Sequence, residues 1–143
     1  MIVAVQAYSK QSIALAQLET ALRLFHVGDD LISVITLAGA AEEILGKLVK
    51  NRGRNNSLDS LKKAAAAMYE GLFSESIDTR VFADRANRAR NALKHLTAGG
   101  DPVSLDLREE ALDILNRAVD DYWILETSLT PAMEEFMRAQ RAA

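Results

Sequence analysis

The sequence predicts an all-α fold, an up-down helical bundle of five main helices with a short sixth helix at the C-terminus. Apolar residues recur at helical spacing along most of the chain, and strand-like alternation is weak. Only seven glycines and two prolines occur in 143 residues, and long helices tolerate few of either. Aromatic residues make up 6%, which argues against a β-sandwich. Because this length suits one domain, residues 1–143 are expected to form a single helical-bundle domain.

The first two helices are predicted over about residues 9–27 and 31–51. Gly28 ends the first, and Asp29 or Asp30 offers an N-cap for the second. The second helix has the widest apolar arc of the chain, so we expect it to be central. The arc consists of Leu31, Val34, Ile35, Ala38, Ala41, Leu45 and Leu48.

A shorter third helix is predicted over about residues 58–70, with Ser57 as its N-cap and Gly71 at its end. A fourth follows over about residues 79–96 and stops before Gly99-Gly100.

Asp106 and Glu109 form a capping-box variant at the start of the fifth helix. Its apolar stripe is Ala111, Leu115, Ala118, Tyr122, Leu125 and Leu129. Thr130-Pro131 reads as N-cap and first residue of the short sixth helix. Because the connections are short, neighbouring helices are expected to be antiparallel.

The composition excludes several classes of site. There is no cysteine, so disulfides, thiolate metal sites and cysteine nucleophiles are ruled out, and two histidines are too few for a histidine-rich metal site. We therefore expect no metal and no cofactor. The N-terminus lacks the basic start of a secretory signal, and the longest uncharged stretch is too short for a bilayer span. A cytoplasmic protein without a membrane partner is expected.

Charge is unevenly distributed in a chain of net charge −3. Residues 46–95 hold eleven basic and five acidic side chains, whereas both flanking segments are acidic. A basic middle segment can attract a local polyanion, but the packing of oppositely charged helices side by side is the favoured explanation.

The predicted helix over residues 79–96 carries a polar stripe opposite its apolar face. At 100° per residue, Asp84, Arg88, Asn91 and His95 share that stripe, and Arg90 lies on its flank. Arginine stabilises charge on a phosphate, and histidine transfers protons, so the set suits phosphodiester chemistry. A solvated helix face with pairing of Asp84 to Arg88 is the alternative.

The segment RNALKH, residues 90–95, resembles the Arg-x(4–6)-His motif of HEPN domains, with the polar residue favoured after the arginine present as Asn91. The segment AAEEILGKLVK from Ala40 is similar to the second helix of such domains. The resemblance implies a helical bundle, usually dimeric, with Arg90, Asn91 and His95 as catalytic residues. Arg88 fits the longer spacing and is the alternative phosphate anchor.

Two functions follow from this resemblance. Many HEPN domains are metal-independent ribonucleases whose sites face each other across a dimer, and others bind nucleotides, so RNA or a nucleotide is an expected ligand. The toxin-like members imply an antitoxin-type protein partner. The alternative is a catalytically silent, dimeric interaction module. Active members often carry a tyrosine where this chain has Thr97, which favours that alternative.

Three further residues are candidates with structural alternatives. Glu42, at the edge of the central helix's apolar arc, is expected either to orient an arginine or His95 of the fourth helix or to form a plain interhelical ion pair. His26 suits a helix C-terminus. Trp123 flanks the fifth helix's stripe as a core-edge residue or a dimer contact.

Overall fold

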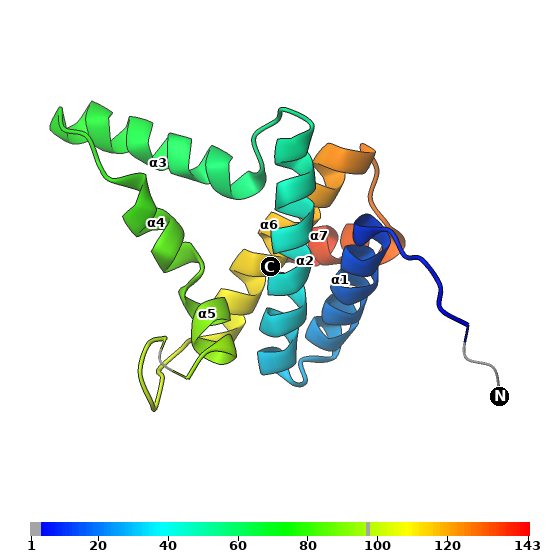
Figure 1. The fold of residues 1–143 in the computed structure, drawn as a ribbon. Helices are drawn as coiled ribbons and strands as arrows, with labels where there is room; N and C mark the ends of the chain where they lie inside the picture. Colours follow the sequence, from blue (N-terminus) through cyan, green and yellow to red (C-terminus); the bar gives the residue numbers. More distant parts are fainter. Residues whose placement is uncertain (1–3, 97) are drawn as a thin grey trace.

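The structure is a computed structural model that describes residues 4–96 and 98–143, so Thr97 lies outside the described residues. The regular elements in this part of the chain are all α-helices (Figure 1), as the sequence predicts. They are α1 (Lys10–Val27), α2 (Leu31–Asn51), α3 (Ser57–Phe73), α4 (Thr79–Ala86), α5 (Arg88–Lys94), α6 (Leu107–Glu126) and α7 (Pro131–Ala142).

Most helix boundaries follow local signals. The side chains of Asp30, Asp106 and Thr130 each accept a hydrogen bond from the backbone N–H three residues later, as the predicted N-caps require. Gly28 ends α1 in the left-handed conformation. The predicted cap of α3 is wrong by one residue: Asn56 caps the helix, and Ser57 is already helical.

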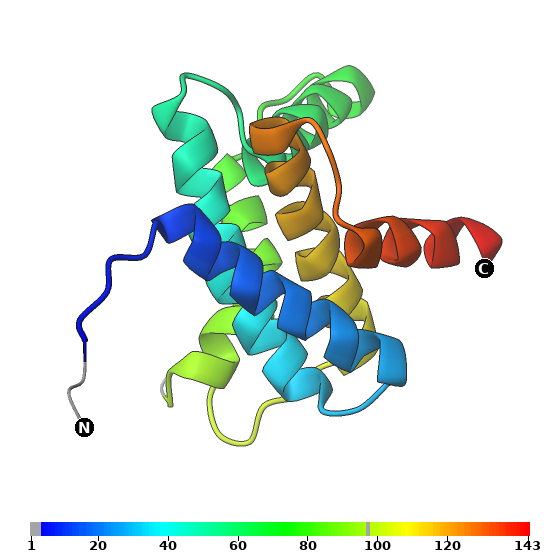
Figure 2. The ribbon, with the colours of Figure 1, turned by 90° about the vertical axis from the view of Figure 1, so that its right-hand side faces the viewer.

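The core lies where α2 packs against α1 and α6. Buried apolar side chains of these helices and of α7 form one cluster that includes Leu18, Ile35, Leu45, Leu115 and Met133. Figure 2 shows α1 crossing the α2–α6 pair, with α7 extending to one side. The predicted central position of α2 is present in this packing. Five of the six residues of the predicted fifth-helix stripe are buried on α6, and the sixth, Leu129, lies beyond its end and is partly buried.

The expected up-down order of five main helices is not confirmed, because α2 and α6 run in the same direction. Glu42 meets Arg117, and further along both helices Arg52 donates to the carbonyl of Leu125. Because the residue numbers increase in the same direction on both helices, α2 and α6 are parallel. The parallel arrangement arises because residues 52–106 leave the core through α3 and return through α4 and α5 to the level where α2 began (Figure 1).

The helices α3 and α4, residues 57–86, form an arm that projects from the core (Figure 1). Among the seventeen residues of α3 only Ser57 is buried, and α4 has no buried residue. The arm also carries most of the exposed large apolar side chains of the helices. They are Leu61, Met68, Leu72, Phe73 and Val81.

The predicted single helix over residues 79–96 is instead two helices that break at Asn87, and the second ends at Lys94. The guanidinium of Arg117 donates to the carbonyl oxygen of Ala86 at 3.1 Å. In an unbroken helix this carbonyl would accept from the N–H of Arg90. A contact from a distant helix therefore accompanies the break, which local sequence does not reveal. No helix in residues 4–96 or 98–143 is long and apolar enough to cross a membrane.

Candidate functional site

A buried ion-pair cluster joins three helices at the middle of the fold. Glu42 on α2 accepts from Nε of Arg117 on α6 at 3.1 Å and lies 3.9 Å from Nη1 of Arg90 on α5. Glu42 and Arg117 are both 5% exposed. Two guanidinium groups thus share one carboxylate, and the carbonyl oxygen of Ala86 accepts a further hydrogen bond from Nη2 of Arg117. Burial of such charges is tolerated only because they are paired and hydrogen-bonded.

Gly39, one turn before Glu42, provides the space for Arg90. A Cβ at this glycine would lie 2.7 Å from both Cγ and Cδ of the arginine and 3.2 Å from Cδ1 of Ile114. The stem of Arg90 therefore runs across the bare backbone of α2 toward the carboxylate. The small residue is needed for this close approach rather than for an unusual backbone angle.

The candidate site residues of the predicted fourth helix lie in different surroundings, and Asp84, the remaining residue of the predicted stripe, is exposed on α4. Arg90 points into the Glu42 cluster, and only 18% of its side chain is exposed. Arg88 is on the surface, 3.4 Å from Glu110 on α6. Asn91 is half-buried. His95 is exposed and extended, one residue past the end of α5. The predicted stripe assumes a continuous helix, and the break at Asn87 together with the early end of α5 removes that assumption.

Glu42 contacts an arginine of the predicted fourth helix, as both of its expected roles require. The sequence analysis missed its principal partner, Arg117. The sequence does indicate a partner at this position, because the charged residue Arg117 lies between Leu115 and Ala118 of the predicted stripe. A charge at the edge of a buried stripe requires a partner on a neighbouring helix.

Asp121 is a second buried acid that the sequence analysis missed. It lies one turn beyond Arg117, is 1% exposed and accepts from the backbone N–H of Ser57 at 2.7 Å. Burial raises the pKa of its carboxyl to about 7, and the nearby charges of Glu42 and Asp120 act in the same direction. The hydrogen bond from Ser57 and the charge of Arg117 oppose this rise only in part. Asp121 therefore ties the start of the arm to α6.

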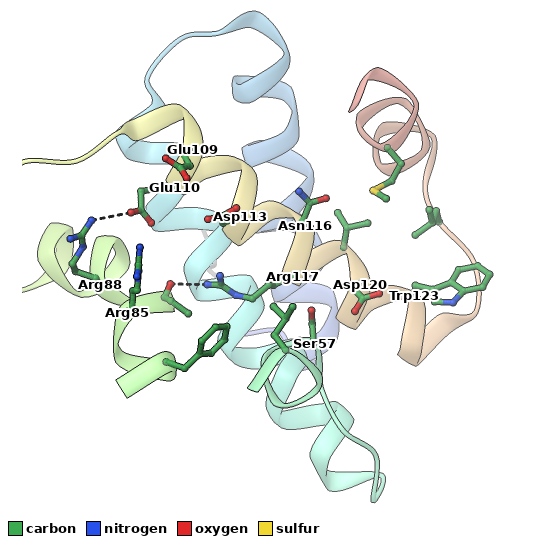
Figure 3. A pocket seen from close by; sticks show the side chains of 16 residues that line it. Ser57, Arg85, Arg88, Glu109, Glu110, Asp113, Asn116, Arg117, Asp120 and Trp123 are labelled. Carbon is green, nitrogen blue, oxygen red and sulfur yellow. Dashed lines mark hydrogen bonds and ion pairs between the residues drawn. The ribbon is translucent and has the colours of Figure 1, made fainter. Parts of the chain in front are cut away.

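A groove of about 800 Å³ lies between the arm, α5 and α6 (Figure 3). We call it the arm groove. Arg85 and Arg88 line one side of it, and acidic side chains of α6 line the other. Leu61, Phe82 and Trp123 are among its apolar residues. The acidic residues are Glu109, Glu110, Asp113 and Asp120.

The described residues contain no group of three or more histidine, cysteine or acidic side chains placed to hold a metal ion. No family model, curated protein or solved structure shows significant similarity to the chain. Three features therefore define the candidate site: a charge-paired interior around Glu42, exposed cations on α4 and α5, and an apolar surface on the arm.

Proposed function

We propose that this chain is a helical interaction module that self-associates through the arm. The observation that supports it is the exposure of apolar side chains on an element with almost no interior of its own. Met68 and Leu72 lie one turn apart on α3 and are 67% and 70% exposed. Large apolar side chains that are exposed together on one helix face are typical of an interaction site.

The partner that we propose is a second copy of the chain. An apolar patch buries itself against its own twin through a two-fold axis, the commonest symmetry of protein oligomers. The resemblance to HEPN domains, which are usually dimeric, points the same way. The ion pair between Arg90 and Glu42 also supports an interaction module, because it holds Arg90 inside the protomer rather than leaving it free to contact a substrate.

Light scattering after size exclusion tests this proposal at micromolar concentration. The parent is expected at twice the 15.7 kDa of one chain. Met68→Glu with Leu72→Glu is expected to give a monomer with unchanged helicity. Ile32→Glu is the matched control, since Ile32 is an exposed apolar residue in the first turn of α2, away from the arm. A parent that elutes as a 15.7 kDa particle would refute the proposal.

RNA binding, with or without cleavage, is the second candidate function. It is favoured by the exposed cations on and just after α4 and α5, which include Arg85, Arg88, Lys94 and His95. In the described part of the chain, Arg88 alone among these four is within ion-pair distance of an acid. The Arg-x(4–6)-His resemblance adds a metal-independent ribonuclease as the specific activity.

Fluorescence anisotropy with single-stranded RNA, and a cleavage assay in the presence of a chelator, test the second candidate. His95→Ala is expected to lower the cleavage rate by about 10²–10⁴, the usual contribution of an acid–base group. Arg88→Ala is the cleaner test of the phosphate anchor, because Arg90→Ala also disrupts the buried cluster. If the parent neither binds nor cleaves RNA, this candidate fails and the interaction module remains.

A further inference from the structure

A second cavity, of about 760 Å³, lies on the side of the core away from the arm. It is formed by the last turns of α1, the first turns of α6 and one face of α7. We call it the α1–α7 cavity. Its volume lies within the range of about 300–1,000 Å³ that is typical of small-molecule sites.

The apolar wall of this cavity is held by specific contacts. Phe25 of α1 meets Phe136 of α7 edge to face, with 5.7 Å between ring centroids. Asn116 of α6 and Gln140 of α7 exchange two amide hydrogen bonds, at 2.8 and 3.1 Å, which fix α7 against the core. Because α7 presents the small residue Ala139 to the cavity, open volume remains beside these contacts.

The charged residues of the cavity are mostly basic. Arg23 and Arg108 line it, beside the imidazole of His26, and no acidic side chain lies within ion-pair distance of the two arginines in residues 4–96 and 98–143. The guanidinium carbon of Arg108 lies 5.0 Å from the ring centroid of Phe25. The one acidic lining residue, Glu135, is already paired with Arg138 at 2.7 Å. This excess of cations is notable in a chain of net charge −3.

We propose that the α1–α7 cavity binds an amphipathic anion, a carboxylate on an alkyl body such as a fatty acid. The alkyl body fits against the aromatic and aliphatic wall, where burial of apolar surface drives binding. The carboxylate pairs with Arg23 and Arg108 at the rim, because guanidinium groups bind carboxylates through charge-assisted hydrogen bonds. The proposal is independent of self-association, since the cavity shares no lining residue with the arm.

Isothermal titration with decanoate, below its micelle concentration, tests the proposal. Saturable one-to-one binding is expected, and 1-decanol of the same alkyl length is expected to bind more weakly. Arg23→Gln and Arg108→Gln are each expected to weaken decanoate binding about threefold to fivefold, the upper part of the range for exposed ion pairs, without changing decanol binding. Ala139→Leu is expected to weaken both ligands by filling the cavity. Arg85→Gln in the arm groove is the control and should change neither.

Two results would overturn the proposal. One is the absence of decanoate binding up to about 1 mM, the weak limit of specific affinity. The other is binding that Arg23→Gln with Arg108→Gln leaves unchanged. Co-sedimentation with vesicles of phosphatidylglycerol distinguishes the source of the anion. Vesicle binding that decanoate displaces assigns the cavity to the acyl chain and headgroup of a lipid, and decanoate binding without vesicle binding assigns it to a free acid.

Discussion

Replacing Glu42 by glutamine removes one charge from a cluster in which that charge serves two cations. The carboxylate contacts Arg117 through both oxygens, at 3.1 and 3.5 Å, and Arg90 at 3.9 Å. Glutamine keeps the shape and one acceptor oxygen, but its NH₂ group adds donors facing a guanidinium that needs acceptors. Arg117, with 6% of its side chain exposed, cannot reach water without displacing the packing around it.

The expected cost of Glu42→Gln is about 3–5 kcal/mol of unfolding free energy, the range measured when one partner of a buried ion pair is removed. For a domain of this size, each kcal/mol lowers the melting temperature by about 2–4 °C. The variant should therefore melt about 6–20 °C below the parent.

Urea unfolding followed by circular dichroism measures this loss. Glu43→Gln is the matched control, because Glu43 is the next residue and, within residues 4–96 and 98–143, forms an ion pair only with exposed Lys47, at 3.3 Å. That change should cost less than about 1 kcal/mol. Glu42→Leu combined with Arg90→Met and Arg117→Met should recover much of the stability, since apolar replacement of a complete set of buried ions is often neutral. A loss below about 1 kcal/mol for Glu42→Gln would refute the buried pairing.

Three further predictions concern other buried positions. Leu115→Ala should destabilise the fold by about 2–5 kcal/mol in urea unfolding, because Leu115 is fully buried at mid-stripe, and a loss below about 1 kcal/mol would contradict that packing. Burial raises the pKa of Asp121 from its ordinary 3.8 to about 7, so its contribution to stability is full below pH 4 and is lost as the pH rises through 7. Asp121→Asn mimics the protonated acid and should be more stable than the parent at pH 8, with the difference shrinking toward pH 5; equal urea midpoints at pH 8 would contradict this. Gly39→Ala should lower the free energy of unfolding by about 1–3 kcal/mol, because its Cβ displaces Arg90. Gly71→Ala should raise the free energy of unfolding by about 0.5–1 kcal/mol, because the space around its Cβ is open. An increase at both glycines would show that Arg90 moves freely.

The helices themselves are predictable because their signals are local. A carboxylate or hydroxyl at Asp30, Asp106 or Thr130 satisfies a backbone N–H three residues away, and this interaction needs no knowledge of the rest of the fold. The break at Asn87 is different, since it coincides with a hydrogen bond from Arg117, thirty-one residues beyond Ala86. Periodicity alone therefore extends the fourth helix too far.

The candidate site was also predictable only where its signals are local. The position of Glu42 at the edge of an apolar arc indicates that it meets a cation, and Arg90 is one of them. Which cation dominates depends on the register of α2 against α6, and a parallel pair places Arg117 there. The geometry of His95 depends on where α5 ends, and a regular 100° count does not reveal that end.

The parallel pairing of α2 and α6 has a consequence for the folding reaction. The hairpin of α1 and α2 closes over the short segment Gly28–Asp30, whereas Glu42 and Arg117 are 75 residues apart in the chain. Joining ends separated by about 75 residues costs about 4 kcal/mol of chain entropy, so α6 is expected to dock after the first hairpin has formed. This cost grows only with the logarithm of length, and halving the intervening segment would recover about 0.6 kcal/mol. The segment that carries the arm can therefore lengthen or shorten with little effect on the stability of the core, so that the length of the arm is set by what its surface binds rather than by the packing of α2 against α6.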